Sequence, residues 1–314
     1  MNHEFINATY EPHFSGHESF HLRYGWLKKA YDQVEFTTQT NKLRVFTDDD
    51  SIARFGVGKN MVGSIRYWAT GCNILKGLNS SIAKTKFGDQ IFGAKGLDPY
   101  LENANSLWLL HWNLASNIDR TSYYWVFNYF NEPTFTKKIL LDKLIHFAEK
   151  NDWPSPTINT VEKDLAVLLN TYAMSSQNKM GSEEDSLTSP LAELGLVRKG
   201  QRNDEFHLGW GPKPSLGYGT FLFSLLEFWK KHTNANTLSI DSILLDAGSP
   251  GRIFLMDEND LAFRLMNIEN QTQGKLSWSE TAGMRQIVKS SNFDEDELWK
   301  HVEADFSSSV RKEL

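Results

Sequence analysis

Cysteine is almost absent from this chain, whose 314 residues include only Cys72. A single cysteine cannot form an internal disulfide, which excludes a disulfide-stapled secreted domain and is typical of a protein of the reducing cytoplasm. Cys72 lies in the apolar segment 70–75, where burial would raise its pKa. We therefore expect a structural rather than a nucleophilic role for its thiol.

Long apolar runs and leader features are also missing. No hydrophobic stretch approaches the roughly 20 residues that a membrane-spanning helix requires, and residues 1–13 lack the basic and apolar regions of a signal peptide. The glycines of residues 56–60 lack the spacing of a phosphate-binding loop, and no apolar strand precedes them. These absences predict a cytoplasmic protein with no membrane partner and no nucleotide cofactor.

Acidic residues are missing from one long segment of an otherwise acidic chain. The net charge is −6, yet residues 51–88 contain six basic side chains and no acid, whereas the rest of the chain has 27 basic and 39 acidic residues. Such segregation creates a local positive potential, for which a polyanion is the usual partner. We therefore predict DNA as a partner. The predicted DNA-binding residues are Arg54, Lys59, Asn60, Arg66, Lys76, Lys28 and Lys29.

The same segment has the pattern of a helix–turn–helix. The acids at 48–50 and Ser51 predict a capped helix start, residues 56–58 break that helix, and a second amphipathic helix follows over 59–75. In a helix–turn–helix the second helix reads DNA. The alternative interpretation is an ordinary helical hairpin with a solvated basic face.

Hydrophobic periodicity predicts a mainly α, multi-domain protein with small β-hairpins and winged-helix or helix–turn–helix-like units. We expect further helices at 22–34, 137–149, 157–172, 189–194, 218–232, 238–245, 257–268 and 295–306, hairpins at 196–208 and 276–288, and a mobile stretch at 175–186. The predicted units are a DNA-binding unit at 1–97, a buried helical connector at 98–134, a second winged-helix-like unit at 135–212, and a C-terminal helical unit with a small hairpin at 213–314.

Two features of the central region bear on its role. The predicted helix at 157–172 carries Glu162 and Asp164, which favours protein docking over DNA reading for the second unit. In the connector, Trp108, Trp112 and Trp125 lie in segments too apolar for the surface, so we expect them in the core. A platform for stacked bases is the alternative.

The segment 17–21 matches H-E-x-x-H, a zinc-protease signature that requires a helix so that both histidines share one face. Pro12 and Gly16 crowd the front of the motif and nothing apolar precedes it. We expect an extended approach to the first helix, and no zinc protease.

The polar cluster around this motif nevertheless suits phosphodiester chemistry. His17 and Glu18 could act as metal ligand or base and Arg23 as a phosphate clamp, because hydrolysis of a phosphodiester needs activated water and cations at the developing charge. The predicted metal ion is Mg²⁺ or Mn²⁺, with Asp48, Asp49 and Asp50 as a reserve site. The alternatives are a hydrogen-bonded network that pins the N-terminal arm and, for the three aspartates, a helix cap.

Two blocks of the sequence, GHESFHLRYGWLKKAYD at 16–32 and DDDSIARFGVGKNMVGSIRYWATGCNIL at 48–75, resemble the signature blocks of a prokaryotic family known as domain of unknown function 4007. The resemblance extends over most of the chain. This family is associated with phage-defence gene clusters, beside proteins related to phosphoadenosine-phosphosulfate reductase, and is similar to SspB, the nicking component of single-stranded DNA phosphorothioation.

The resemblance implies a DNA-binding protein of a phosphorothioation-based antiphage system, which nicks DNA so that sulfur can replace a non-bridging phosphate oxygen. Its implied partners are the sulfur-transfer and ATPase proteins of that system. A non-catalytic DNA-binding or protein-docking subunit of the same kind of complex is the alternative. The resemblance assigns no catalytic residue to this chain.

Overall fold

A computed structural model describes residues 4–35, 42–78, 81–173, 189–202, 204–281 and 283–309 of the protein. About half of the chain is helical, and three small antiparallel sheets lie among the described residues, which makes this a mixed α/β fold. The stretch 175–186, predicted to be mobile, lies outside the described residues. No helix within the described ranges is long and apolar enough to cross a membrane.

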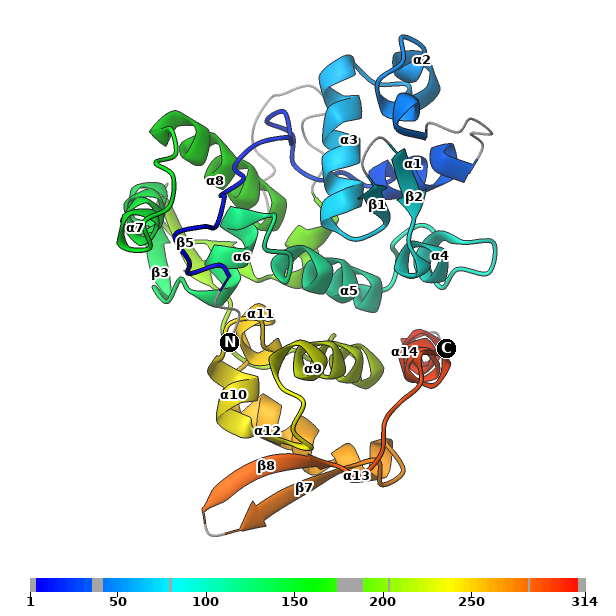
Figure 1. Ribbon diagram of the computed structural model, residues 1–314, viewed down its shortest axis with the longest axis vertical. Helices are drawn as coiled ribbons and strands as arrows, with labels where there is room; N and C mark the ends of the chain where they lie inside the picture. The colour runs from blue at the N-terminus through cyan, green and yellow to red at the C-terminus, as the bar shows by residue number, and fades with distance from the viewer. Residues whose placement is uncertain are drawn as a thin grey trace.

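The N-terminal module consists of helices followed by a hairpin (Figure 1). Its elements are α1 (Trp26–Glu35), η1 (Lys42–Phe46), α2 (Ser51–Phe55), α3 (Lys59–Gly71), β1 (Leu75–Leu78), β2 (Ser81–Lys84) and α4 (Lys86–Phe92). Two predicted boundaries are wrong. The first helix starts at Trp26 rather than at 22, after Gly25 at φ +77°. The reading helix ends at Gly71 rather than at 75, because Asn73 adopts φ +58° and the chain turns into β1.

Two buried helices form the centre of the molecule: α5 (Ala104–Ala115) and α6 (Thr121–Asn128). Trp108, Trp112 and Trp125 are at most 2% exposed, as expected for core residues. In Figure 1, α5 lies between the N-terminal module above it and α9 (Tyr218–His232) below it. Apart from Ala192, the buried apolar side chains of the described residues form one continuous cluster.

The central and C-terminal modules share one topology. The central module consists of β3 (Thr134–Thr136), α7 (Lys137–Lys150), α8 (Ile158–Tyr172), η3 (Pro190–Leu194), β4 (Val197–Lys199) and β5 (Glu205–Leu208). The C-terminal module consists of β6 (Thr237–Ser239), α10 (Ile240–Leu245), α11 (Pro250–Ile253), α12 (Glu258–Met266), α13 (Ile268–Gln271), β7 (Leu276–Thr281) and β8 (Met284–Lys289). The strand orders are β3-β5-β4 and β6-β8-β7, so in each sheet the last strand lies between the first and the middle one. The predicted helix at 238–245 is partly wrong, because its first residues form β6.

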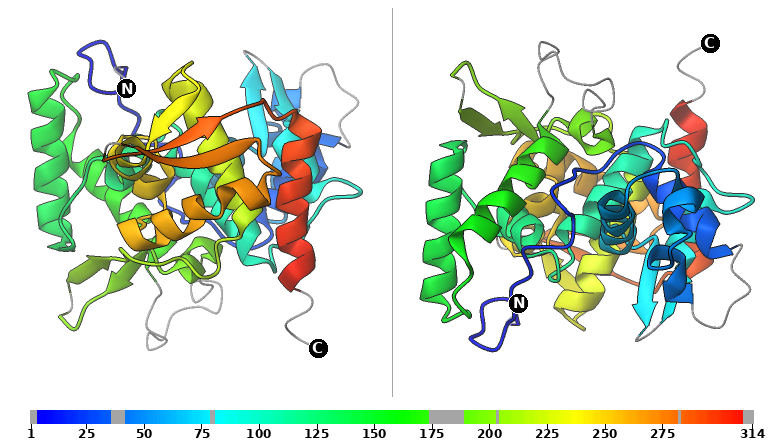
Figure 2. Two further views of the ribbon diagram at one scale, coloured as in Figure 1. Left: turned by 90° about the horizontal axis from the view of Figure 1, so that it is seen from below. Right: turned by 90° about the horizontal axis from the view of Figure 1, so that it is seen from above.

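The last described helix, α14 (Glu295–Ser309), packs against α9, outside the β6-β8-β7 sheet. Figure 2 shows α14 in red along one edge of the molecule in the view from below. The Asp305 carboxylate accepts hydrogen bonds from the backbone N–H groups of Gly219 (3.1 Å) and Thr220 (2.7 Å) at the start of α9. Their position at a helix N-terminus suits a carboxylate.

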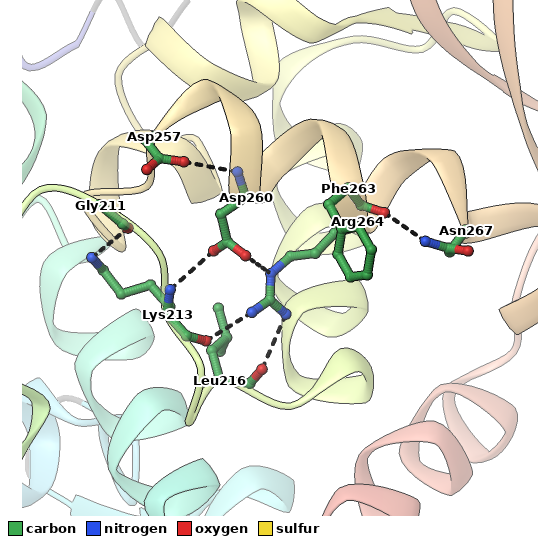
Figure 3. Close-up of polar contacts among 8 residues, drawn as sticks. All are labelled: Gly211, Lys213, Leu216, Asp257, Asp260, Phe263, Arg264 and Asn267. Carbon is green, nitrogen blue, oxygen red and sulfur yellow. Dashed lines mark hydrogen bonds and ion pairs between the residues drawn. The ribbon is translucent and has the colours of Figure 1, made fainter.

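The linker 209–217 joins the central module to α9, and α12 fixes it in place (Figure 3). Arg264 donates to the carbonyl oxygens of Lys213 (2.8 Å) and Leu216 (3.0 Å). The Asp260 carboxylate accepts from the Lys213 backbone N–H (3.1 Å) and from Arg264 Nε (3.3 Å). Burial lowers the pKa of the Lys213 amine to about 8, and the amine donates to two carbonyl groups of its own turn. We interpret this network as structural.

An extended arm, residues 4–25, crosses the modules before α1 begins; it is the dark blue trace that passes α6 and α8 on its way to α3 in Figure 1. The ring of Phe5 packs edge-on against Trp153, whose indole N–H donates to the Phe5 carbonyl (3.1 Å). Further along, the Tyr10 hydroxyl lies 2.7 Å from Thr121 Oγ1. The arm therefore reaches α3 already anchored to the central helices.

Candidate functional site

A cavity of about 720 Å³ opens along one face of α3. The α3 side chains that line it recur every three or four positions, which places them on one face of the helix; they are Lys59, Asn60, Gly63, Arg66, Tyr67 and Thr70. We call this cavity the α3 pocket. Three of the predicted DNA-binding residues, Lys59, Asn60 and Arg66, are therefore neighbours on its floor.

The arm forms one wall of the α3 pocket through Ser15, Gly16 and Glu18. Its backbone here is unusual: Glu18 and Ser19 both have positive φ, at +48° and +65°. Left-handed backbone at two consecutive non-glycine residues is strained, and such strain concentrates at functional sites. It also excludes the helix that a zinc-protease motif needs, as expected from the sequence.

Contacts with α3 hold the strained turn in place. The Phe20 carbonyl accepts from Trp68 Nε1 (3.1 Å) and Ser64 Oγ (3.4 Å). Glu18 also lies directly over Gly63, where a Cβ would make an ordinary contact of 3.5 Å with Glu18 Cγ. The exposed Glu18 carboxylate is thus carried on a fixed backbone next to the floor of the α3 pocket.

The segment from Phe46 to Ile52 forms another wall, with Asp48 and Asp49 in the lining. The predicted helix start is confirmed, because α2 begins at Ser51 with Asp50 as its N-cap residue, but Asp50 makes no side-chain capping bond. The aspartates instead occupy the turn between η1 and α2. Asp48 and Asp49 face the cavity, whereas Asp50 is not part of its lining.

Arg120, at the N-terminal end of α6, closes the C-terminal end of the α3 pocket. Its guanidinium donates to Thr70 Oγ1 (2.9 Å) and the Tyr67 carbonyl (3.1 Å), and its Cζ lies 4.2 Å from the centre of the Tyr67 ring. Burial, and then the Asp164 carboxylate, raise the pKa of the Tyr67 phenol, an effect that Arg120 opposes. Arg120 was not predicted from the sequence, because only the packing of α6 against α3 brings it to the pocket.

His17, a predicted catalytic residue, points away from the α3 pocket. Its side chain is buried, and Nε2 lies 2.9 Å from a carboxylate oxygen of Asp164 on α8. Its Nδ1 accepts a hydrogen bond from the Ser19 backbone N–H (3.0 Å). The ring edge contacts Tyr67 at a centroid distance of 5.5 Å. His17 thus lies behind the pocket wall that carries Glu18.

The predicted phosphate clamp, Arg23, also lies outside the pocket lining. It is buried, with its guanidinium 5.5 Å from the centre of the Trp26 ring and 5.8 Å from that of Phe20. The arginines that line the cavity are instead Arg66 and Arg120.

The remaining predicted DNA-binding residues lie around the pocket rather than in it. Lys28 forms an ion pair with Asp32 (2.5 Å), and Lys29 donates to the Phe55 carbonyl (3.3 Å). Arg54 donates to the Val45 carbonyl (3.3 Å), and Lys76 is exposed on β1.

Within the described ranges, no acid forms an ion pair with Lys59, Arg66 or Lys76. By contrast, Lys86 pairs with Glu295 at 2.7 Å. Lys76, on the hairpin, and Lys59 and Arg66, in the α3 pocket, are therefore cations of the segment 51–88 that have no ion-pair partner among the described residues. Glu18, Asp48 and Asp49 also line that cavity.

Cys72 is fully buried at the end of α3, and burial raises its pKa to about 12. Because the thiolate is the reactive form, this thiol is inert at neutral pH. The expected structural role agrees with this position.

Comparison with known proteins identifies the family to which this chain belongs. Residues 14–305 match the model of a family described as "Protein of unknown function (DUF4007)". The chain belongs to the DUF4007 family. None of the curated proteins is significantly similar in sequence.

Two solved structures share the fold of this DUF4007 protein. A magnesium ion-bound SspB crystal structure is 30% identical with a TM-score of 0.81, covering 94% of this chain and 88% of the SspB chain. A second SspB crystal structure is 28% identical with a TM-score of 0.80, covering 96% of this chain and 94% of the other. The likeness spans all modules, so the DUF4007 protein has the fold of SspB throughout.

Proposed function

We propose that this DUF4007 protein is a component of a DNA phosphorothioation-based antiphage system, and that it binds a DNA strand in the α3 pocket and nicks it. One observation carries the proposal: three separate segments bring carboxylates and cations into the same cavity. Glu18 comes from the arm, Asp48 and Asp49 from the turn before α2, and Lys59 and Arg66 from α3.

The cations of the pocket suit a phosphodiester. Arg66 presents a guanidinium group, which matches phosphate oxygens in a fork, and Lys59 adds a point charge, whereas Arg120 contributes its charge from a fixed position. Positive charge placed where negative charge develops is the main contribution of a protein to phosphoryl chemistry. Asn60 offers an amide to the neighbouring backbone or base.

Glu18 is the residue we assign to proton transfer. Its carboxylate is exposed to the pocket and its backbone is fixed by α3. There it would accept the proton of the attacking water as the phosphodiester is cleaved. His17 acts through it, as a positioning residue that holds the strained turn against α8.

The pocket fits a divalent ion as a shared site rather than as a closed cage. Among the described residues, no three His, Cys, Asp or Glu side chains come together closely enough to hold a metal. Mg²⁺ and Mn²⁺ are nevertheless commonly bound by one or two carboxylates together with phosphate oxygens. Asp48 and Asp49 would supply those carboxylates here. When bound, the ion would activate water and neutralise phosphate charge.

The order of elements in the N-terminal module supports the assignment to DNA. Helices α1, α2 and α3 are followed directly by the β1–β2 hairpin, which contacts α3, so the basic residues of α3 and of the hairpin lie near one another. The exposed Lys76 on β1 lies where flanking backbone would pass.

A second function, a non-catalytic DNA-binding or docking subunit of the same kind of complex, is favoured by a different observation. The C-terminal module exposes several large apolar side chains on α10, α12 and β8, which a partner protein could cover; they are Leu245, Phe263, Met266 and Met284. The sulfur-transfer and ATPase proteins of the system are the proposed partners.

A plasmid-nicking assay with Mg²⁺ or Mn²⁺ separates the two functions. We expect conversion of supercoiled to open-circular DNA by the wild type, and a loss of at least about tenfold in Asp49→Asn. Asp50→Asn is the matched control, because Asp50 adjoins Asp49 but does not line the pocket. If the wild type never nicks, even with its sulfur-transfer partners present, the non-catalytic function is correct.

A further inference from the structure

The basic face of α3 is concave. Its charged residues, Lys59 and Arg66, line a cavity, and the arm and the segment 46–52 line the same cavity. A helix that reads duplex DNA must instead be the outermost part of its protein. The major groove is about 12 Å wide, and a helix with side chains is already about 10–12 Å across. With these segments lining the same cavity, α3 cannot enter the groove of a paired duplex.

The dimensions of the α3 pocket suit a single strand. Its floor runs from Lys59 to Thr70, about 16 Å along the helix. Its volume of about 720 Å³ lies in the range of cavities that enclose one drug-sized ligand. One or two nucleotides of an extended strand would fill it, with phosphates at Lys59 and near Arg66.

One apolar residue stands at the rim. Ile52 on α2 lines the pocket and is 48% exposed, whereas Phe46, the other apolar residue of the same segment in the lining, is buried. Exposed apolar side chains next to a DNA-binding surface act as wedges between base pairs. Ile52 and Glu18 line the same cavity from different segments, so a strand bound next to Glu18 would be within reach of the exposed Ile52 side chain.

We infer that the substrate of the α3 pocket is an unpaired DNA strand, so that a duplex must open locally, with Ile52 as the wedge, before Glu18 and the cations reach its backbone. This inference rests on the proposed function, because it names the form of DNA that the same site accepts. In this inference α3 binds one unpaired strand and does not read the major groove of a duplex.

Binding of oligonucleotides of one sequence tests the inference. The probes are a single strand, a fully paired duplex and a duplex with a five-nucleotide bubble, measured by fluorescence anisotropy without divalent metal and with the whole chain. We expect the single strand and the bubble to bind at least about tenfold more tightly than the duplex, because only the duplex must unpair. Equal or tighter binding of the paired duplex would overturn the inference.

Nicking rates of rim variants test the wedge. Ile52→Ala should slow nicking of the paired duplex while leaving the rate on the bubble within about twofold, since the bubble is already open. Ile158→Ala is the matched control, because Ile158 is similarly exposed (57%) but lies on α8 outside the pocket. Equal slowing on both substrates would contradict the role of Ile52.

Different results would contradict the proposed function and the inference about an unpaired strand. If Lys59→Ala/Arg66→Ala leaves binding of all three probes unchanged, the pocket is not the DNA site and the proposed function is wrong. If that variant weakens binding but the wild type prefers paired duplex, the proposed function stands and only the inference falls.

Discussion

The imidazole Nε2 of His17 lies 2.9 Å from a carboxylate oxygen of Asp164, and both side chains are buried. Neither oxygen of Asp164 accepts a well-aligned hydrogen bond from a described residue. The imidazole of His17 is therefore the main polar group that offsets burial of this carboxylate. The pair joins the turn that carries Glu18 to α8 of the central module. It links two segments almost 150 residues apart in the chain.

Removal of one partner of this pair should be costly. We expect His17→Ala and Asp164→Ala each to lower the free energy of unfolding by about 3 kcal/mol, because the remaining group is buried without compensation. The double variant should cost less than the sum, with a coupling energy of about 1–3 kcal/mol. Urea unfolding measures this cycle, and strictly additive costs would show that the two groups do not interact.

Arg120 gives a prediction about the far end of the pocket. Arg120→Lys keeps the charge but loses the planar fork that contacts Thr70 and the Tyr67 carbonyl. We expect DNA affinity to fall by roughly tenfold, because the charge-assisted hydrogen bonds that hold Thr70 and Tyr67 in the pocket lining would be lost. Arg198→Lys, at an exposed arginine on β4, is the control. Equal affinities of the two variants would place Arg120 outside the binding site.

Salt dependence reports how many cations meet phosphates. Removing one phosphate-binding cation should reduce the slope of log affinity against log salt by about 0.7–0.9, so that Lys59→Ala/Arg66→Ala lowers it by roughly 1.5. Lys86→Ala should leave the slope unchanged, because Lys86 is paired with Glu295 away from the pocket. A slope that falls equally in both variants would indicate general electrostatic attraction of DNA rather than binding at a defined site.

His111 makes stability sensitive to acid. Burial lowers its pKa to about 3, while its ring contacts the Tyr172 hydroxyl (2.7 Å) and the Ile253 carbonyl (2.8 Å). The unfolded chain binds a proton near pH 6.5 and the folded one does not, so stability falls as the pH drops from 6.5 towards 3.

The slope of this loss is at most about 1.4 kcal/mol per pH unit. We expect urea unfolding between pH 7 and pH 4 to show a smaller loss for His111→Gln than for the wild type. The other titrating groups are common to both proteins and cancel in the comparison. Parallel losses would mean that His111 is protonated in the folded protein.

Regular elements were predictable where the local pattern is strong. The helix at 218–232 has the predicted bounds, because its apolar stripe is continuous and Gly217 precedes it. The hairpins at 197–208 and 276–289 follow from alternation around a turn. The β1–β2 hairpin was missed because the apolar residues after Gly71 continue the helical pattern, although Asn73 is a residue that tolerates the left-handed conformation that ends α3.

The candidate site was predictable only in its parts. Local chemistry indicated Glu18, Asp49 and the basic face of α3, but nothing in the sequence placed them in one cavity. The contacts of His17 with Asp164 and of Arg120 with Thr70 join segments far apart in the chain, so they depend on how the modules pack. The strain at Glu18 has no sequence signal, since glutamate rarely adopts positive φ.

The most direct test of the account is the nicking rate of Glu18→Gln on supercoiled plasmid with Mg²⁺, compared with Glu11→Gln. Glu11 is an exposed glutamate of the same arm that does not line the pocket. Glutamine keeps the size of the side chain and removes the base. The account predicts at least a roughly hundredfold loss for Glu18→Gln, within the range of general-base effects, and none for Glu11→Gln. A Glu18→Gln protein that folds normally and nicks at the wild-type rate would contradict it.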